Sequence, residues 1–212
     1  MKKIHILLGV VIGLLSVTTL SYAADNGKSF DGIVAVVNDG IICQTELNKE
    51  ITIIKQQLQA SHAPIPADKE LKHKVLAHLI DMKLQLEEAD KANITVEQSK
   101  LDTALGNIAK ENHLTVAQLK QAITQQGMRF DEFQQHIRDQ IRIGEILQQK
   151  VASQVQISDV ELKKHLAGSE GNKTREAKIK QQLYDQKYNA AIKDWLLKLR
   201  AAAYIKETGE KG

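Results

Sequence analysis

A short apolar run and a turn begin the patterned part of the chain. Residues 33–37 read Ile-Val-Ala-Val-Val, and Asn38-Asp39-Gly40 separates them from a second apolar run, Ile41 to Cys43. β-Branched residues favour strands, and Asp39-Gly40 supplies residues that tolerate positive φ in a tight turn. The pattern therefore predicts a β-hairpin, whose strands are too short to be stable alone.

After the hairpin, the spacing of apolar residues becomes that of helices. Four of them share one helical face: Leu47, Ile51, Ile54 and Leu58. Thr45 precedes them with a hydroxyl placed to cap the free N–H groups, and the helix should end near Ser61. Beyond Pro64 and Pro66, a second helix is expected from Asp68, with a broad apolar stripe typical of a buried helix. The stripe contains Leu71, Val75, Leu76, Leu79, Ile80, Leu84 and Leu86.

Three hydroxyl residues followed by a Glu or Gln three positions later predict the starts of further helices: Thr95 with Gln98, Thr115 with Gln118, and Ser158 with Glu161. In such a capping box the two side chains satisfy amides that the first turn leaves free. Gly127 is expected just beyond a helix end. Phe133, Ile137 and Ile141, each four apart, predict a helix that continues through Leu147.

The helical pattern stops at residues 168–173 and resumes in a long last helix from Thr174. Its expected apolar face contains Ile179, Leu183, Tyr188, Trp195 and Leu199, with basic residues on much of the remainder. Residues 201–205 then form either a fraying helix end or a strand. The predicted fold is mainly α: a helical domain with a small β-hairpin, closed by a C-terminal helix and a short third strand.

The first residues resemble an export signal. Lys2 and Lys3 precede an apolar stretch from Ile4 to Val17, and Ser21-Tyr22-Ala23 provides small residues at its end. This pattern is typical of a cleaved signal peptide, since a spanning helix needs ~20 steadily apolar residues and this run is broken by threonines. We expect a signal peptide at residues 1–23, a linker at 24–32 and periplasmic localisation. An uncleaved anchor is the alternative.

Composition excludes some functions. The whole chain has 29 basic and 26 acidic residues; without residues 1–23 the basic count falls to 27, because only Lys2 and Lys3 are lost. A nearly neutral chain does not favour nucleic-acid binding. Cys43 is the single cysteine, so no internal disulfide can stabilise an exported form.

Candidate catalytic and metal-binding residues are not supported by their spacing. His73 and His78 lie five apart, which does not place two ligands on one helical face. Glu87 and Glu88 are adjacent, so they point about 100° apart on a helix. Cys43 follows a strand with no obvious histidine partner and is expected to be a packed side chain. We predict no catalytic residue, no metal site, no cofactor and no small-molecule substrate.

The segment IVAVVNDGIICQTEL, residues 33–47, resembles the start of SurA-type chaperones. Three later segments resemble the rest of that family's N-terminal domain in the same order: LKHKVLAHLIDMKLQLEEADKANITV, LGNIAKENHLT and GMRFDEFQQHIRDQIRIGEIL. The final WLLKLRAAAYI resembles the family's closing helix and strand. The resemblance thus extends over most of the chain after the signal segment.

The resemblance implies a domain organisation. Full members of the family carry one or two parvulin-type prolyl isomerase domains before the closing helix, whereas only a short loop, 168–173, stands at that position here. We expect a single domain over residues 33–212, with a core at 33–167, this loop, and a closing helix and strand at 174–212. Isomerase activity is therefore not expected. The strands 33–37, 41–43 and 203–205 are expected to form one sheet.

The resemblance also implies a function, the ATP-independent holding of unfolded exported proteins, outer-membrane β-barrel precursors among them, in an apolar groove. The residues expected to bind clients are Leu105, Ile108, Met128, Phe130 and Phe133, and those expected to anchor the closing helix are Trp195, Leu199 and Tyr204. Two other functions stay open: a prolyl isomerase, alone or with a catalytic partner, and an adaptor for one folded protein. A homodimer also stays open.

Overall fold

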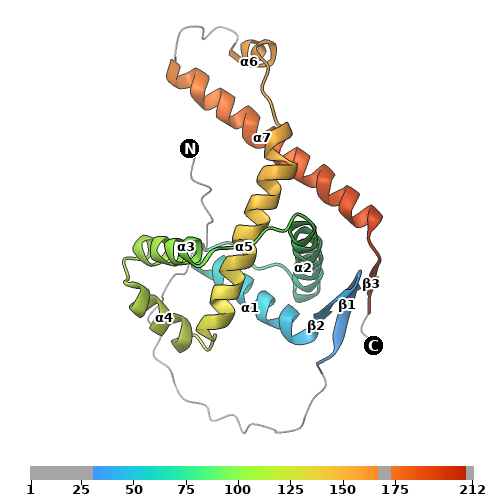
Figure 1. Cartoon of the computed structure of the whole chain (residues 1–212), viewed down its shortest axis with the longest axis vertical. Coiled ribbons are helices and arrows are strands. Elements are labelled where there is room, and N and C mark those ends of the chain that lie inside the picture. The colour runs from blue at the N-terminus through green and yellow to red at the C-terminus, as the bar shows by residue number, and fades with distance from the viewer. Residues whose placement is uncertain (1–30, 167–172, 209–212) are drawn as a thin grey trace. The chain divides into compact units, whose positions relative to one another are not determined.

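The computed structural model describes residues 31–166 and 173–208, and these are mainly helical, which confirms the predicted fold class. Figure 1 shows the elements in chain order. They are β1 (Ile33–Val37), β2 (Gly40–Cys43), α1 (Gln44–Ala60), α2 (Asp68–Lys91), α3 (Gln98–Glu111), α4 (Val116–Gln125), α5 (Phe130–Lys150), a 3₁₀ turn (Ala152–Gln154), α6 (Asp159–Leu166), α7 (Lys173–Ala202) and β3 (Ile205–Glu207). The predicted signal peptide, residues 1–23, and all of the predicted loop 168–173 except Lys173 lie outside the described residues.

The described residues divide into two compact units. The first, here called the sheet unit, contains residues 31–80, 96–138 and 205–208. The second, here called the hairpin unit after the neighbouring helices α6 and α7, contains residues 81–95, 139–166 and 173–204. Each unit is assembled from segments that are distant in sequence. The single domain that we expected over 33–212 stays a prediction.

The sheet unit contains a three-stranded antiparallel sheet in the order β2-β1-β3. Ala35, Val37 and Ile42 are fully buried on one face, whereas Ile33 and Ile41 are exposed on the other. The third strand confirms the expected sheet, but it spans 205–207 rather than 203–205, because α7 continues to Ala202. The hydroxyl of Thr208 donates a hydrogen bond to the carbonyl of Ile33, which continues the pairing of the two distant segments.

The hairpin turn differs in detail from its prediction. Asn38 adopts positive φ, at 50°, whereas neither Asp39 nor Gly40 does. Asparagine tolerates the left-handed region because its short polar side chain can bond locally. A Cβ on Gly40 would lie 3.3 Å from the carbonyl oxygen of Val37, so this glycine serves close approach rather than a left-handed conformation.

The start of α1 also corrects its prediction. Cys43 occupies the N-cap position without a side-chain cap, and Thr45 lies inside the first turn. The backbone N–H of Thr45 donates to Oδ1 of Asp31 at 3.0 Å. A carboxylate fourteen residues earlier thus supplies the acceptor that we expected from the threonine hydroxyl, and it also favours the positive end of the helix dipole.

Four helices end in one backbone motif. After α1, α2, α3 and α4, a residue with positive φ follows the cap: His62, Asn93, His113 and Gly127. In each case the N–H of this residue and of the next one return to carbonyls of the last turn, as in Gly127 to Thr124 and Met128 to Ile123. This is the Schellman pattern. The glycine case was predicted; the asparagine and histidine cases were not, because these residues are less diagnostic of a helix end.

The predicted capping boxes have three different outcomes. Thr115 and Gln118 form the complete reciprocal box, which is confirmed. Ser158 accepts the N–H of Glu161 at 3.2 Å, but the Glu161 carboxylate pairs with Lys187. The box predicted at Thr95 is wrong, because α3 begins at Gln98 and its N-cap residue is Glu97.

The core of the sheet unit combines residues of the sheet with residues of α1, α2, α3 and α4. Its fully or nearly fully buried members include Val37, Ile42, Leu47, Val75, Ile80, Leu101 and Leu119. The predicted stripe of α2 is confirmed except at Leu86, which is half-buried. Phe133 and Ile137 of α5 are also buried.

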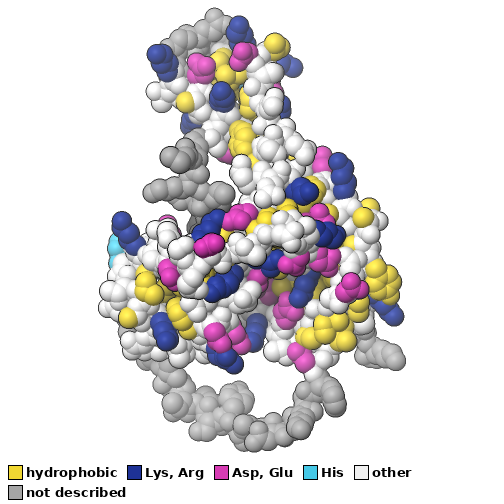
Figure 2. All heavy atoms as spheres, in the orientation of Figure 1, with side chains coloured by type: hydrophobic (Ala, Val, Ile, Leu, Met, Phe, Trp, Pro, Cys, Tyr) yellow, Lys and Arg dark blue, Asp and Glu magenta, His cyan; other side chains and the backbone are white. Residues whose placement is uncertain are grey.

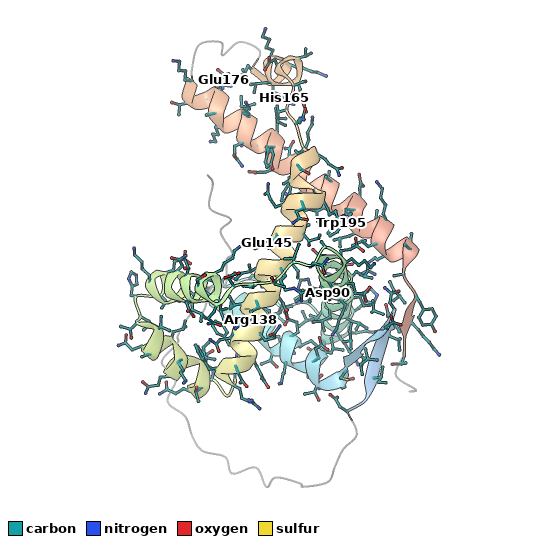
Figure 3. All side chains as sticks on the ribbon, viewed as in Figure 1. Asp90, Arg138, Glu145, His165, Glu176 and Trp195 are labelled. Carbon is teal, nitrogen blue, oxygen red and sulfur yellow. The ribbon has the colours of Figure 1, made fainter. Side chains whose placement is uncertain are left out.

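In the hairpin unit, α7 uses two different sides. Leu183 and Ile179 pack with Leu162 and Leu166 of α6, whereas Trp195, labelled in Figure 3, packs with Ala89, Ile94 and Ile146. At 3.6 residues per turn, Leu183 and Trp195 point about 120° apart. The single apolar face predicted for this helix is therefore wrong: its first half faces α6 and its second half faces the ends of α2 and α5.

Ion pairs accompany both packing regions of the hairpin unit. Nζ of Lys187 donates to Glu161 at 2.5 Å and to the carbonyl of Gln156 at 3.1 Å. Nε of Arg200 donates to Asp81 at 2.6 Å. The Lys187 hydrogen bond lowers the pKa of Glu161.

Candidate functional site

All five residues predicted to bind clients lie in the sheet unit, on α3, α5 and the turn that precedes α5. The structure separates them into two groups. Leu105 and Phe133 are buried, with 3% of each exposed. Ile108, Met128 and Phe130 are half-buried. In the described conformation only the second group offers surface to another molecule, so Leu105 and Phe133 support the site from the core.

Phe130 is the centre of the accessible group. Its ring stacks on that of Phe133, with centroids 6.2 Å apart and planes inclined by 28°. Nζ of Lys120, on α4, lies 5.6 Å from the centroid of the Phe130 ring, in the range of a cation–π contact. Phe133 thus fixes the ring from the core side, and the lysine covers part of it from the solvent side.

Val116 belongs to the same surface, and the sequence analysis missed it. Its side chain is 43% exposed, and it precedes Lys120 by four residues, so both lie on one face of α4. A valine on the first turn of a capped helix, beside the buried stripe of Leu119 and Ile123, was the available signal. Val116, Lys120, Met128 and Phe130 are called the α4 surface below.

The α4 surface is unusually poor in charge. From Leu114 to Met128 the only charged residue is Lys120, and the exposed remainder is mostly glutamine, threonine and alanine. At its border, Arg129 pairs with Asp131, and the hydrogen bond lowers the pKa of that carboxyl. The pair neutralises itself, so an uncharged chain can approach without leaving a fixed charge unpaired.

The predicted anchors of the closing helix differ from one another. Trp195 packs against a buried cluster and Leu199 is half-buried. Tyr204 is 60% exposed and therefore lacks the burial that we expected of an anchor.

The described residues contain no group of three or more His, Cys, Asp or Glu side chains that could hold a metal ion. His73 and His78 are exposed, and Cys43 is half-buried. Over the same ranges, 31–166 and 173–208, none of the helices combines the length and apolarity needed to cross a bilayer.

Comparison with known proteins identifies the family. The model of the SurA N-terminal domain matches residues 30–147, which include β1 to α5 and therefore the whole α4 surface. The chain belongs to the SurA N-terminal domain family. The match covers more than half of the chain. Four of the five segments quoted above fall within it, and the fifth, the closing helix and strand, lies outside it.

Curated relatives of this family carry the name Chaperone SurA. The protein of Legionella pneumophila strain Philadelphia 1 is 33% identical over 146 residues, which is 69% of this chain and 34% of the relative. That of Methylococcus capsulatus is 34% identical over 142 residues, 67% of this chain and 31% of the relative. The matched region thus spans about a third of the length of these relatives.

A solved structure of similar fold comes from Campylobacter jejuni, from work on the virulence factor PEB4 and the periplasmic protein Cj1289, described as two structurally related SurA-like chaperones. The TM-score is 0.59, and the similarity covers 84% of this chain and 99% of the other. Sequence identity is only 12%, so this likeness shows a shared fold. It extends beyond residue 147, because 84% of the chain is longer than the family match.

Proposed function

We propose that this chain is an ATP-independent chaperone that holds unfolded exported proteins, chiefly precursors of outer-membrane β-barrels, in the periplasm. The observation that carries the proposal is the α4 surface, an accessible apolar and nearly uncharged region inside the part that matches the SurA N-terminal domain. The names of the curated relatives support it.

The physical fit is to an extended chain rather than to a folded partner. A β-barrel strand alternates apolar and polar residues, and in the unfolded state its backbone amides are unpaired. Val116, Met128 and Phe130 can cover alternate apolar side chains, while exposed glutamine amides such as Gln121 and Gln125 can both donate and accept hydrogen bonds. The area offered is small, so binding should be weak and reversible.

The proposal includes two further points. The chain is exported after cleavage near residue 23, as the basic start and apolar run Ile4–Val17 favour. It holds clients without isomerising prolyl bonds, a proposal that is supported by the short segment 168–173 at the position where, by resemblance, the parvulin domains of ~100 residues are inserted. No cofactor is required for holding of this kind.

A turbidity assay tests the holding activity. An unfolded porin is diluted from urea, and its aggregation is followed with and without residues 24–212 of this chain at equal molar amounts. We expect aggregation to be suppressed without ATP. Val116→Asp and Phe130→Asp should weaken suppression, because each places a charge on the α4 surface. Ile65→Asp, at a residue of matched 42% exposure in the loop before α2, is the control and should keep full activity.

The two other functions give different results. A prolyl isomerase would accelerate proline-limited refolding in proportion to its concentration, above an uncatalysed time of tens to hundreds of seconds. An adaptor would bind one folded protein and leave the porin to aggregate. Equal suppression by Val116→Asp, Phe130→Asp and the parent would show that clients bind elsewhere.

A further inference from the structure

Charge is distributed unevenly over the described residues. The sheet unit has eleven basic and twelve acidic residues, whereas α6 and α7 together have ten basic and five acidic ones. The near neutrality of the whole chain therefore hides a positive region on two neighbouring helices. Figure 2 shows basic and apolar side chains together over α6 and the first half of α7.

Most of this positive charge is not used inside the protein. Lys187 pairs with Glu161, and Arg200 pairs with Asp81. Seven exposed lysines have no ion-pair partner among the residues that the structure describes: Lys163, Lys164, Lys173, Lys178, Lys180, Lys193 and Lys198. Their charge is available to an outside partner.

Exposed apolar side chains accompany these lysines. Val160 at the start of α6 is 79% exposed, Leu197 near the end of α7 is 57% exposed, and Tyr204 follows the helix at 60%. Helices that bind at a lipid interface combine lysines with exposed apolar residues. Such residues can enter the headgroup layer, where removal of their apolar surface from water is favourable.

We propose that the α6–α7 hairpin is a docking surface for anionic lipid headgroups. The assignment rests on charge complementarity. The predominance of lysine over arginine on this surface favours lipid over an acidic protein. Specific carboxylate recognition uses the rigid fork of arginine, but eight of the ten basic residues here are lysines, and both arginines, Arg175 and Arg200, already interact within the chain. A fluid anionic surface requires positive charge without a fixed geometry.

Vesicle sedimentation tests the proposal. Residues 24–212 include every described element and lack the apolar stretch Ile4–Val17, which would itself enter a bilayer. This form is mixed at low ionic strength with vesicles of phosphatidylglycerol and phosphatidylcholine in equal parts, or of phosphatidylcholine alone. We expect sedimentation with the anionic vesicles and its loss as salt is raised beyond ~0.1 M, where the screening length falls to about 10 Å.

A charge-matched pair of variants locates the surface. Lys178→Gln, Lys180→Gln and Lys193→Gln are combined in one variant, and glutamine keeps the helix because its propensity is close to that of lysine. Each lysine near an anionic surface contributes roughly fivefold to partitioning, so the triple variant should bind at least about tenfold more weakly. The control combines Lys69→Gln, Lys110→Gln and Lys206→Gln in the sheet unit, has the same net charge, and should bind like the parent.

Three outcomes would overturn the proposal. They are no sedimentation with anionic vesicles, equal sedimentation with both vesicle types, and equal weakening by the two triple variants. Binding to polyglutamate without binding to vesicles would point to an acidic protein partner instead. The turbidity assay with unfolded porin should give the same result for the parent and both variants, so failure of lipid docking is distinguishable from failure of client holding.

Discussion

The sheet unit and the hairpin unit are stabilised in different ways. The sheet unit combines a hydrogen-bonded sheet, a complete capping box at Thr115 and helix ends closed by backbone hydrogen bonds over a broad core. In the hairpin unit, α7 packs through two side-chain clusters, and of its 30 residues only Leu183 is buried. A long helix with so little burial depends on a few tertiary contacts, because helix propensity alone rarely sustains it.

The largest effect is expected from removal of residues 174–212. This deletion takes Trp195 and Leu183 from the hairpin unit and β3 from the sheet unit, so the product should unfold or aggregate. Soluble yield and the far-ultraviolet circular dichroism melt measure it. Removal of residues 205–212 alone is the matched comparison, since it takes only β3; a folded product with a lowered melting temperature is expected. If both deletions melted like the parent, α7 would be a free appendage rather than part of a core.

The next largest loss of stability is expected from Trp195→Ala. The indole packs on Ala89, Ile94 and Ile146, but it is only half-buried, so we expect about 3 kcal/mol, the lower end of the range for large-to-small changes of aromatics. Urea unfolding followed by circular dichroism gives the value. Leu197→Ala on the same helix, 57% exposed, should change stability by less than about 0.5 kcal/mol. Equal costs at the two positions would contradict the packing described.

Gly127→Ala tests a helix end in the sheet unit. The glycine has φ of +81°, and a Cβ there would meet nothing within 4 Å, so the cost is purely conformational, about 1–2 kcal/mol for an L-residue in the left-handed region. The same unfolding experiment measures it. Gly106→Ala, in the middle of α3 with equally open space, should stabilise by up to about 1 kcal/mol instead. Opposite signs of the two stability changes would show that backbone conformation, rather than packing, determines the effect at each glycine.

The smallest effect on stability is expected from the ion pair of Glu161 and Lys187, and it depends on pH. The Lys187 hydrogen bond lowers the pKa of Glu161 in the folded state, so the unfolded chain binds the proton first. The pair therefore stabilises the hairpin unit above the unfolded carboxyl pKa, about 4.3, and this contribution is lost as pH falls through the lower folded pKa. Glu161→Gln should reduce stability slightly at pH 7 and have a smaller effect near pH 3. Urea midpoints at both pH values measure it, and an equal loss at both would exclude the ion pair as the cause.

The accuracy of the sequence predictions depends on whether a feature is determined by neighbouring residues or by residues distant in sequence. Local patterns indicated the hairpin, the start of α2, the capping box at Thr115 and the end at Gly127, because neighbouring residues determine them. The Asp31 cap of α1 and the two-sided packing of α7 were not predicted, since each depends on residues brought together only by folding. At the candidate site, Leu105 and Phe133 were expected to contact clients, whereas tertiary packing buries them and leaves Val116 exposed.

Pairing of Ile33 with Thr208 joins residues 175 positions apart. A chain that crosses a membrane from its first residue onward exposes β1 and β2 long before β3 arrives. The edge of β1 that pairs with β3 then stays unpaired until residues 205–208 arrive. The entropic cost of closing so long a loop comes before the stabilisation that the strand pair provides. An unpaired strand edge is itself prone to join other chains, so a chain exported as proposed would pass through a state that resembles its proposed clients.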